Sequence, residues 1–449
     1  MTAPATPWLQ SLKSQRADSS ADSPHERDGD YAIEAQLQEL LIQDIDDSAL
    51  HGLDPDLMRE RVEQAARALA AIRFPRLVGD TKEIVVAHVV DEMVGLGPLE
   101  PLLRDPNVSE VMVNAPDEVY IERDGVLYES DVRFRDEAHV RGIVDRIVAS
   151  IGRHVDEASP MVDARLRDGS RVNVIIPPLS PRSAVVTIRK FRSDRYQMSD
   201  IVAIGTLTDH MAEVLDGCVR AKLNILVSGG TGTGKTTLLN ALSSSIPSRE
   251  RIVTIEDPIE LKLQQRHVIS LEARPASAEG RGEVGQRDLV RNALRMRPDR
   301  IIVGEVRGSE AFDMMQAMNT GHEGSLTTVH ANSARDALGR IENMVMMAGF
   351  EMPINAIREQ MASAFDVIIQ LSRLSDGSRR IVSLTEVAGM EGPRISLQDV
   401  FAYKQQGVNA DGRVIGELAP TGIRPQFADR IRTFGIELGE DTFDIGRWR

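Results

Sequence analysis

Residues 225–237 read ILVSGGTGTGKTT, and this stretch decides how the rest of the chain is interpreted. Its opening apolar run predicts a buried strand, and the leucine spacing of LLNALSS after it predicts a helix. Between them lies the complete G-x-x-x-x-G-K-[ST] pattern, in the strand–loop–helix context that this pattern requires. The glycines let the backbone fold tightly, so that N–H groups turn inward at a helix N-terminus and bind phosphate oxygens. The stretch therefore predicts a site for a nucleoside triphosphate.

The side chains of this P-loop, residues 229–236, have distinct predicted tasks. Lys235 is expected to reach the β- and γ-phosphates, and the hydroxyl of Thr236 is expected to hold Mg²⁺. The sequence contains no Asn/Thr-Lys-x-Asp segment for guanine recognition, so a GTPase is disfavoured. The predicted nucleotide-binding residues of this stretch are Gly230, Thr231, Gly232, Thr233, Gly234, Lys235, Thr236 and Thr237.

Length and composition limit the class of protein. A chain of 449 residues is too long for one core, so two or three domains are expected. The formal net charge of −15 argues against broad nucleic-acid binding, which needs a basic footprint. The single cysteine, Cys218, excludes an internal disulfide framework and a cysteine zinc site. No apolar run approaches the ~18 residues of a membrane span, and the N-terminus lacks a signal-peptide core. We therefore expect a soluble, cytoplasmic protein.

The N-terminal region divides into a tail and a helical module. Residues 1–30 are rich in Ser, Asp, Pro and Ala, and they are predicted to be disordered. A helical period begins at Tyr31, and two further helices are expected to start near Asp54 and Asp80. A helical module is therefore predicted over residues 31–94.

The rest of the chain is predicted to form two domains of mixed structure. Short alternating segments divided by turns, together with one amphipathic helix, predict an α+β domain over residues 95–190. Residues 191–204 are the expected linker. From residue 205, short apolar strands alternate with helices, which predicts a parallel sheet covered by helices on both faces. Antiparallel-looking strands and a helix after residue 377 indicate a C-terminal β/α subdomain, which completes a domain over residues 205–449.

Two acidic segments follow predicted strands. RIVTIEDPIE (251–260) places carboxylates where a strand meets a loop, and RIIVGEVRG (300–308) places Glu305 directly after a buried strand. In parallel α/β sheets the strand ends converge on the ligand crevice, so both segments should face the P-loop. One carboxylate could complete the Mg²⁺ shell while another orients and deprotonates the attacking water. We expect Glu305 to activate the water, with Glu256 and Glu260 as alternatives; a capping or exposed role stays open for Glu260.

The segment TGHEGSLTTVHANS (320–333) carries two histidines on either side of a turn and a strand. Their i, i+8 spacing and the lack of a nearby cysteine make a metal site a poor interpretation. We expect His322 and His330 to be neutral, to hydrogen-bond the phosphates and to sense their loss. His330 is also a candidate for the catalytic set, and a buried structural role for it stays open.

In this order, the P-loop, TIEDPIE, VGEVRG and TGHEGSLTTVHANS resemble the Walker A, Asp box, Walker B and His box of the type II/type IV secretion ATPases. Within that superfamily the chain is similar to the CpaF/TadA branch, which powers tight-adherence pili. The resemblance includes ARLRDGSRVNVIIPP and LRMRPDRIIVGEVRG, and the lack of a four-cysteine zinc insertion separates the chain from the general-secretion-pathway ATPases. It implies a RecA-like P-loop ATPase domain, a preceding α+β domain of PAS-like type, and a hexameric ring.

The same resemblance implies roles for particular residues. It assigns Mg²⁺ chemistry to Asp257 and Glu305 beside Thr236, and phosphate sensing to the two histidines. In such rings the N-terminal domain closes over the nucleotide, and arginines of that domain are candidates to reach the phosphates. Arg suits this task because its planar fork is always charged, although a plain surface position stays open for each. These arginines are Arg165, Arg171 and Arg189.

The resemblance finally implies partners and a task. The expected partners are five further copies in a homohexamer and the inner-membrane platform proteins of a pilus, with no nucleic acid. The chain would then associate peripherally with the inner face of the cytoplasmic membrane and convert ATP hydrolysis into pilus assembly or retraction. A conjugation-like ATPase for DNA or protein transfer is the main alternative, and a nucleotide-gated assembly scaffold is another.

Overall fold

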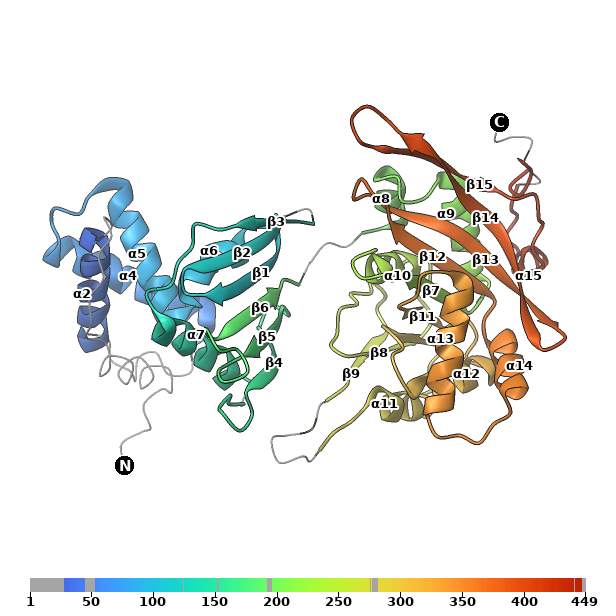
Figure 1. The fold of residues 1–449 in the computed structure, drawn as a ribbon, viewed down its shortest axis with the longest axis horizontal. Coiled ribbons are helices and arrows are strands. Elements are labelled where there is room, and N and C mark those ends of the chain that lie inside the picture. Colours follow the sequence, from blue (N-terminus) through green and yellow to red (C-terminus); the bar gives the residue numbers. More distant parts are fainter. Residues whose placement is uncertain are drawn as a thin grey trace. The chain divides into compact units, whose positions relative to one another are not determined.

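The computed structural model describes residues 28–44, 53–123, 125–151, 153–191, 196–274, 276, 282–439 and 441–445. The chain forms two compact units, unit 1 (Met1–Arg192) and unit 2 (Ser193–Arg449), as shown in Figure 1. Most of the tail predicted to be disordered lies outside the described residues, but its last residues, from Asp28, already belong to a helix. No helix in the described part of the chain combines the length and the apolar character needed to span a membrane.

The first part of unit 1 is a bundle of helices with one apolar core. One helix begins where the sequence predicts, because the Asp54 carboxylate accepts a hydrogen bond from the backbone N–H of Asp56 at 3.0 Å. The next begins at Gly79, one residue before the predicted Asp80, and Val78 before it provides no side-chain cap. The helices are α2 (Asp28–Asp44), α4 (Pro55–Arg73) and α5 (Gly79–Val94).

The second part of unit 1 is a six-stranded antiparallel sheet in the order β3-β2-β1-β6-β5-β4. Apolar side chains alternate along the central strands and pack against α7 (Glu137–Ala149) on one face of the sheet. The opposite face carries charged, polar and apolar side chains together. The strands are β1 (Val108–Ala115), β2 (Glu118–Arg123), β3 (Val126–Glu129), β4 (Met161–Arg165), β5 (Arg171–Ile175) and β6 (Val185–Arg189), and η1 (Gly97–Leu99) and α6 (Glu100–Arg104) precede them.

Helix α7 also joins this sheet to the helical bundle. Arg146 Nη1 donates a hydrogen bond to the carbonyl oxygen of Glu92 at 2.8 Å, and His139 Nε2 lies 2.9 Å from Glu92 Oε1. Burial acts to raise the pKa of Glu92, but the hydrogen bond from His139 and the positive charges of His139, Arg135 and Arg146 together lower it. The bundle and the sheet are therefore held together by charged contacts as well as by chain connectivity.

Unit 2 is built on a nine-stranded mixed sheet in the order β15-β14-β13-β12-β7-β11-β10-β8-β9. The neighbours from β12 to β9 are parallel, whereas β13, β14 and β15 are antiparallel and extend the same sheet. The strands are β7 (Ile225–Gly229), β8 (Ile252–Glu256), β9 (Val268–Glu272), β10 (Arg300–Val303), β11 (Leu326–Val329), β12 (Val367–Arg373), β13 (Arg379–Glu391), β14 (Arg394–Val408) and β15 (Val414–Pro420). Strand β9, at the edge, is one that the sequence did not predict.

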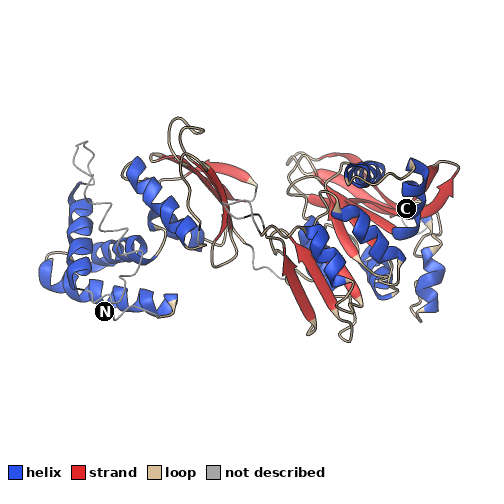
Figure 2. Ribbon diagram, turned by 90° about the horizontal axis from the view of Figure 1, so that it is seen from below, coloured by secondary structure: helices blue, strands red, loops and turns tan. Residues whose placement is uncertain are grey.

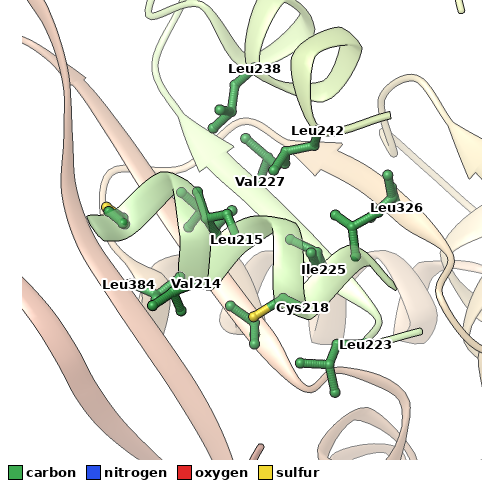
Figure 3. Packing of buried hydrophobic residues seen from close by; sticks show 14 of the residues in the cluster. Val214, Leu215, Cys218, Leu223, Ile225, Val227, Leu238, Leu242, Leu326 and Leu384 are labelled. Atoms are coloured by element: carbon green, nitrogen blue, oxygen red, sulfur yellow. The ribbon is translucent and has the colours of Figure 1, made fainter. Parts of the chain in front are cut away.

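Helices cover both faces of this sheet (Figure 2). On β7, Ile225 and Val227 belong to one apolar core and Leu226 to the other, which explains why this strand is apolar at successive positions. Figure 3 shows the first core, where Leu215 and Cys218 pack beside β7. The helices are α8 (Met198–Ala203), α9 (Asp209–Arg220), α10 (Lys235–Ser243), α11 (Gln286–Ala293), α12 (Glu310–Asn319), α13 (Ala334–Met347), α14 (Ile354–Ala364) and α15 (Phe427–Thr433).

One helix lies in the segment that we expected to be a linker. Residues 198–203 form α8, which packs against α9 and α10 and contributes the buried Ile201 to the first core. The sequence did not indicate this helix because it is short and follows a polar stretch.

Candidate functional site

Four neighbouring parallel strands of unit 2 end at the same edge of the sheet. Strand β7 leads into the P-loop, β11 into His330, β10 into Gly304 and Glu305, and β8 ends at Glu256. Their registers keep these ends level, since Ser228 pairs with Val329 and β8 runs level with β10 up to Val303. The segments that the sequence predicted to converge are therefore brought together by strand order.

The P-loop has the shape that a phosphate site needs. Gly232 and Gly234 adopt positive φ angles of 69° and 94°, which side chains rarely tolerate. A Cβ added to Gly229 would lie 2.6 Å from Thr233 Oγ1, so the loop also excludes a side chain at its start. Helix α10 begins directly after Gly234, and its first N–H groups are available to an anion.

Lys235 lies within the curve of this loop. Its Nζ donates hydrogen bonds to the carbonyl oxygens of Gly229 and Gly230, both at 2.9 Å. These contacts hold the ammonium at the centre of the P-loop, where β- and γ-phosphate oxygens would compete for it. The structure therefore places the Lys235 ammonium inside the loop, and its contact with the phosphates stays a prediction.

The loop after β8 returns to the start of α10. The hydroxyl of Thr236 donates a hydrogen bond to Glu260 Oε2 at 3.2 Å. A hydroxyl and a carboxylate are hard oxygen ligands of the kind that Mg²⁺ binds, so this pair fits the expected ion. The described residues contain no cluster of three or more His, Cys, Asp or Glu side chains suited to a metal.

The two other acids of this segment lie in different surroundings. Asp257, the predicted Mg²⁺ ligand, is exposed and precedes a cis peptide bond to Pro258. Glu256 is 2 % exposed, and its Oε1 accepts hydrogen bonds from the N–H groups of Glu260 and Leu261, both at 2.8 Å. Burial raises the pKa of Glu256, although these hydrogen bonds oppose the shift. Its contacts make Glu256 an anchor for the loop that carries Glu260.

Glu305, the predicted water-activating residue, lies at the end of β10. Its carboxylate is one-quarter exposed, and its Oε2 accepts a hydrogen bond from Arg307 Nη2 at 2.6 Å. Gly304 before it packs tightly, because a Cβ there would lie 2.9 Å from Glu256 Cγ. Glu305 is therefore accessible at the edge of the sheet, whereas Glu256 is not.

The two predicted histidines lie at opposite ends of β11. His330 follows the strand at the P-loop edge, and partial burial and the positive charge of Lys235 lower its pKa. Glu305 is close enough to oppose that shift. His322 precedes the strand, and its backbone N–H donates a hydrogen bond to the carbonyl oxygen of Ala317. Within this chain the structure therefore brings His330 to the P-loop and leaves His322 at the other edge of the sheet.

The predicted arginines of unit 1 form one row across three strands. Arg165 of β4 pairs with Arg171 of β5, and Arg171 pairs with Arg189 of β6. Residues directly opposite one another share a face of the sheet, so the three side chains lie on the face that α7 does not cover. The row continues on β1 with Glu110, whose Oε1 lies 3.7 Å from Arg189 Nε. The sequence identified these residues singly, and only strand pairing shows that they form a group.

Sequence comparison then identifies the family. The model of the family described as "Type II/IV secretion system protein" matches residues 92–417. The chain belongs to this family. The match begins inside α5 and covers the whole sheet of unit 1 and most of unit 2. The chain is therefore a member of the type II/IV secretion ATPase superfamily over these parts.

Relatives within the family have several names. The "Putative conjugal transfer protein Rv3659c" of Mycobacterium tuberculosis is 37 % identical over 349 residues, which cover 76 % of this chain and 98 % of that protein. The "Type IV secretion system protein VirB11" of Bartonella henselae is 30 % identical over 315 residues, covering 62 % of this chain and 88 % of the relative. "Conjugal transfer protein TrbB" of Rhizobium radiobacter is 31 % identical, covering 68 % of this chain and 90 % of the relative.

Solved structures are also similar to parts of this chain. The VirB11 ATPase of the Brucella suis type IV secretion system, in complex with sulphate, is 30 % identical with a TM-score of 0.35, covering 64 % of this chain and 94 % of that one. The pilus retraction motor PilT with bound ADP is 22 % identical with a TM-score of 0.48, covering 75 % of this chain and 86 % of that one.

Proposed function

We propose that this chain is an Mg²⁺-dependent ATP hydrolase that powers assembly of a tight-adherence pilus. It works in the cytoplasm, as a homohexameric ring at the inner face of the membrane, against platform proteins of the pilus. The observation that carries the enzymatic part is the convergence of Lys235, Glu305 and His330 at one edge of the unit 2 sheet. The pilus assignment, the ring and the PAS-like character of unit 1 rest on the sequence resemblance alone.

The proposed chemistry divides among these residues. The P-loop N–H groups and Lys235 bind the phosphates, and Thr236 with Glu260 holds Mg²⁺, which neutralises developing charge on the phosphoryl oxygens. Glu305 orients and deprotonates the attacking water. His330, kept neutral by its surroundings, hydrogen-bonds the transferring phosphate. Asp257 and Glu256 help to hold the loop that carries Glu260. The proposed phosphate contacts from unit 1 are Arg165, Arg171 and Arg189.

Turnover measurements test the enzymatic part. Lys235→Ala should abolish both nucleotide binding and hydrolysis, because the phosphates lose their central cation. Glu305→Gln should keep binding but reduce kcat by about 10²–10⁴-fold, the usual contribution of a general base. Arg394→Ala is the matched control, because Arg394 is an exposed residue on β14, and this variant should have wild-type turnover. Wild-type turnover in either site variant would overturn the assignment.

The ring is tested by molar mass in solution. We expect light scattering to show six copies in the presence of Mg²⁺ and a non-hydrolysable ATP analogue. A monomer under every nucleotide condition would contradict the ring and would leave the unit 1 arginines without a partner site in another copy.

A transfer ATPase is the second candidate, because relatives at 37 % and 31 % identity carry conjugal transfer names. The two functions separate in cells that carry Glu305→Gln. Loss of surface filaments with unchanged DNA transfer supports the pilus motor, whereas the reverse supports the transfer ATPase. Strong, salt-sensitive stimulation of turnover by DNA would also favour the transfer ATPase.

A further inference from the structure

The β12–β13 hairpin lies beside the P-loop, although no sequence motif points to it. Strand β12 pairs in parallel with β7, and Leu371 lies opposite Gly229. The approach is close, because the carbonyl oxygen of Leu371 would be only 2.9 Å from a Cβ on Gly229. The hairpin then continues past the end of β7, where Arg373 on β12 pairs with Arg379 on β13.

Arg379 reaches the P-loop itself. Its Cδ lies 3.7 Å from the position that a Cβ on Gly234 would take. Gly234 caps α10 and directly precedes Lys235, so this contact is at the phosphate-binding end of the helix. The guanidinium is attached to that Cδ, and Arg379 is solvent-exposed, so a ligand on the loop can meet it. Arg373 is placed differently, because its Nη2 approaches Gly377 in the turn of its own hairpin.

The charges around Gly234 and Arg379 suit a chain of phosphates. The N-terminus of α10 and the Lys235 ammonium already supply positive potential. A guanidinium beside them adds a planar, permanently charged donor that can bind two phosphate oxygens at once. A phosphate chain bound at the N-terminus of α10 would therefore meet a second cation, which comes from β13.

We propose that Arg379 contacts the phosphate chain of the nucleotide bound to the P-loop of the same chain. This inference rests on the proposed nucleotide site, and it adds a binding residue that the four sequence motifs do not contain. It differs from the predicted roles of Arg165, Arg171 and Arg189, because Arg379 belongs to the unit that carries the P-loop.

Equilibrium binding of Mg-ATP, Mg-ADP and adenosine to the full chain tests this contact. Arg379→Ala should weaken the binding of Mg-ATP and Mg-ADP about tenfold, in line with the loss of a charged hydrogen bond. The affinity for adenosine should stay unchanged. Arg379→Lys should recover part of the affinity because it restores the charge. Arg394→Ala removes an exposed arginine from the hairpin at the far end of β13 and should bind like wild type.

The outcomes separate this inference from the proposed function. If the wild-type chain fails to bind Mg-ATP, both the proposed function and the proposed role of Arg379 are wrong. If wild type binds and Arg379→Ala binds equally well, only this inference fails. The inference is also wrong if Arg379→Ala weakens adenosine binding by the same factor. It is wrong too if Arg379→Lys recovers no affinity and both Arg379 variants have a lower melting temperature in the absence of nucleotide.

Discussion

The hydroxyl of Thr236 donates a hydrogen bond to the carboxylate of Glu260 at 3.2 Å. This contact joins the first turn of α10 to the loop after β8, which the buried Glu256 carboxylate holds through two backbone N–H groups. It places Glu260, rather than Asp257, beside the hydroxyl that is expected to bind Mg²⁺. The assignment of the second protein ligand therefore depends on how the loop folds back.

A magnesium titration distinguishes these two carboxylates. Glu260→Gln should raise the Mg²⁺ concentration for half-maximal ATP turnover about tenfold, because the ion loses a charged oxygen in its shell. Asp257→Asn is the matched control, and it should leave the Mg²⁺ requirement unchanged because Asp257 is exposed and the Thr236 hydroxyl bonds Glu260 instead. An increased requirement in Asp257→Asn alone would restore the sequence-based assignment.

The pH dependence of turnover should report His330. Partial burial and Lys235 lower its pKa from the ordinary value of 6.5, so the imidazole takes up a proton only below that pH and stays neutral at pH 7. We expect kcat/KM to fall on the acidic side of pH 6.5, and His330→Asn to lose this limb of the profile. An NMR titration of the wild-type imidazole gives the direct check, and a midpoint above 6.5 would contradict the shift.

A buried ion pair supports the opposite edge of the sheet. Arg300, at the start of β10, is 0 % exposed, and its Nε donates to Glu250 Oε2 at 2.5 Å. Glu250→Ala should lower the free energy of unfolding by about 3–5 kcal/mol, because the guanidinium stays buried without its carboxylate. Asp216→Ala breaks the exposed pair with Arg220 and should cost under about 0.5 kcal/mol. Urea denaturation measures both, and equal losses would show that burial does not govern these pairs.

Two glycine substitutions should have opposite effects. A Cβ at Gly304 would lie 2.9 Å from Glu256 Cγ, so Gly304→Ala should destabilise the chain by about 1–3 kcal/mol through overpacking. Gly339 lies inside α13 with no atom within 4 Å of an added Cβ, so Gly339→Ala should stabilise by about 0.5–1 kcal/mol. Thermal unfolding compares the two variants. A stabilised Gly304→Ala variant would mean that the Glu256 side chain can move aside.

The sequence by itself determined the P-loop and much of the strand pattern. The P-loop depends on glycines and a Lys-Thr pair at fixed offsets, which are local features of the chain, and it forms as predicted around Lys235. The parallel strands were predictable because both of their faces are buried, which makes them apolar at successive positions. Asp54 likewise starts its helix through a contact two residues away.

Only the tertiary structure decided which distant side chains meet. Strand order places β11 beside β7, and this brings His330 to the P-loop. Loop folding places Glu260 beside the Thr236 hydroxyl, and hairpin pairing brings Arg379 to Gly234 from a position far along the chain. The physical reason is that residue spacing specifies periodicity and turns, whereas these contacts depend on which strands become neighbours in the sheet.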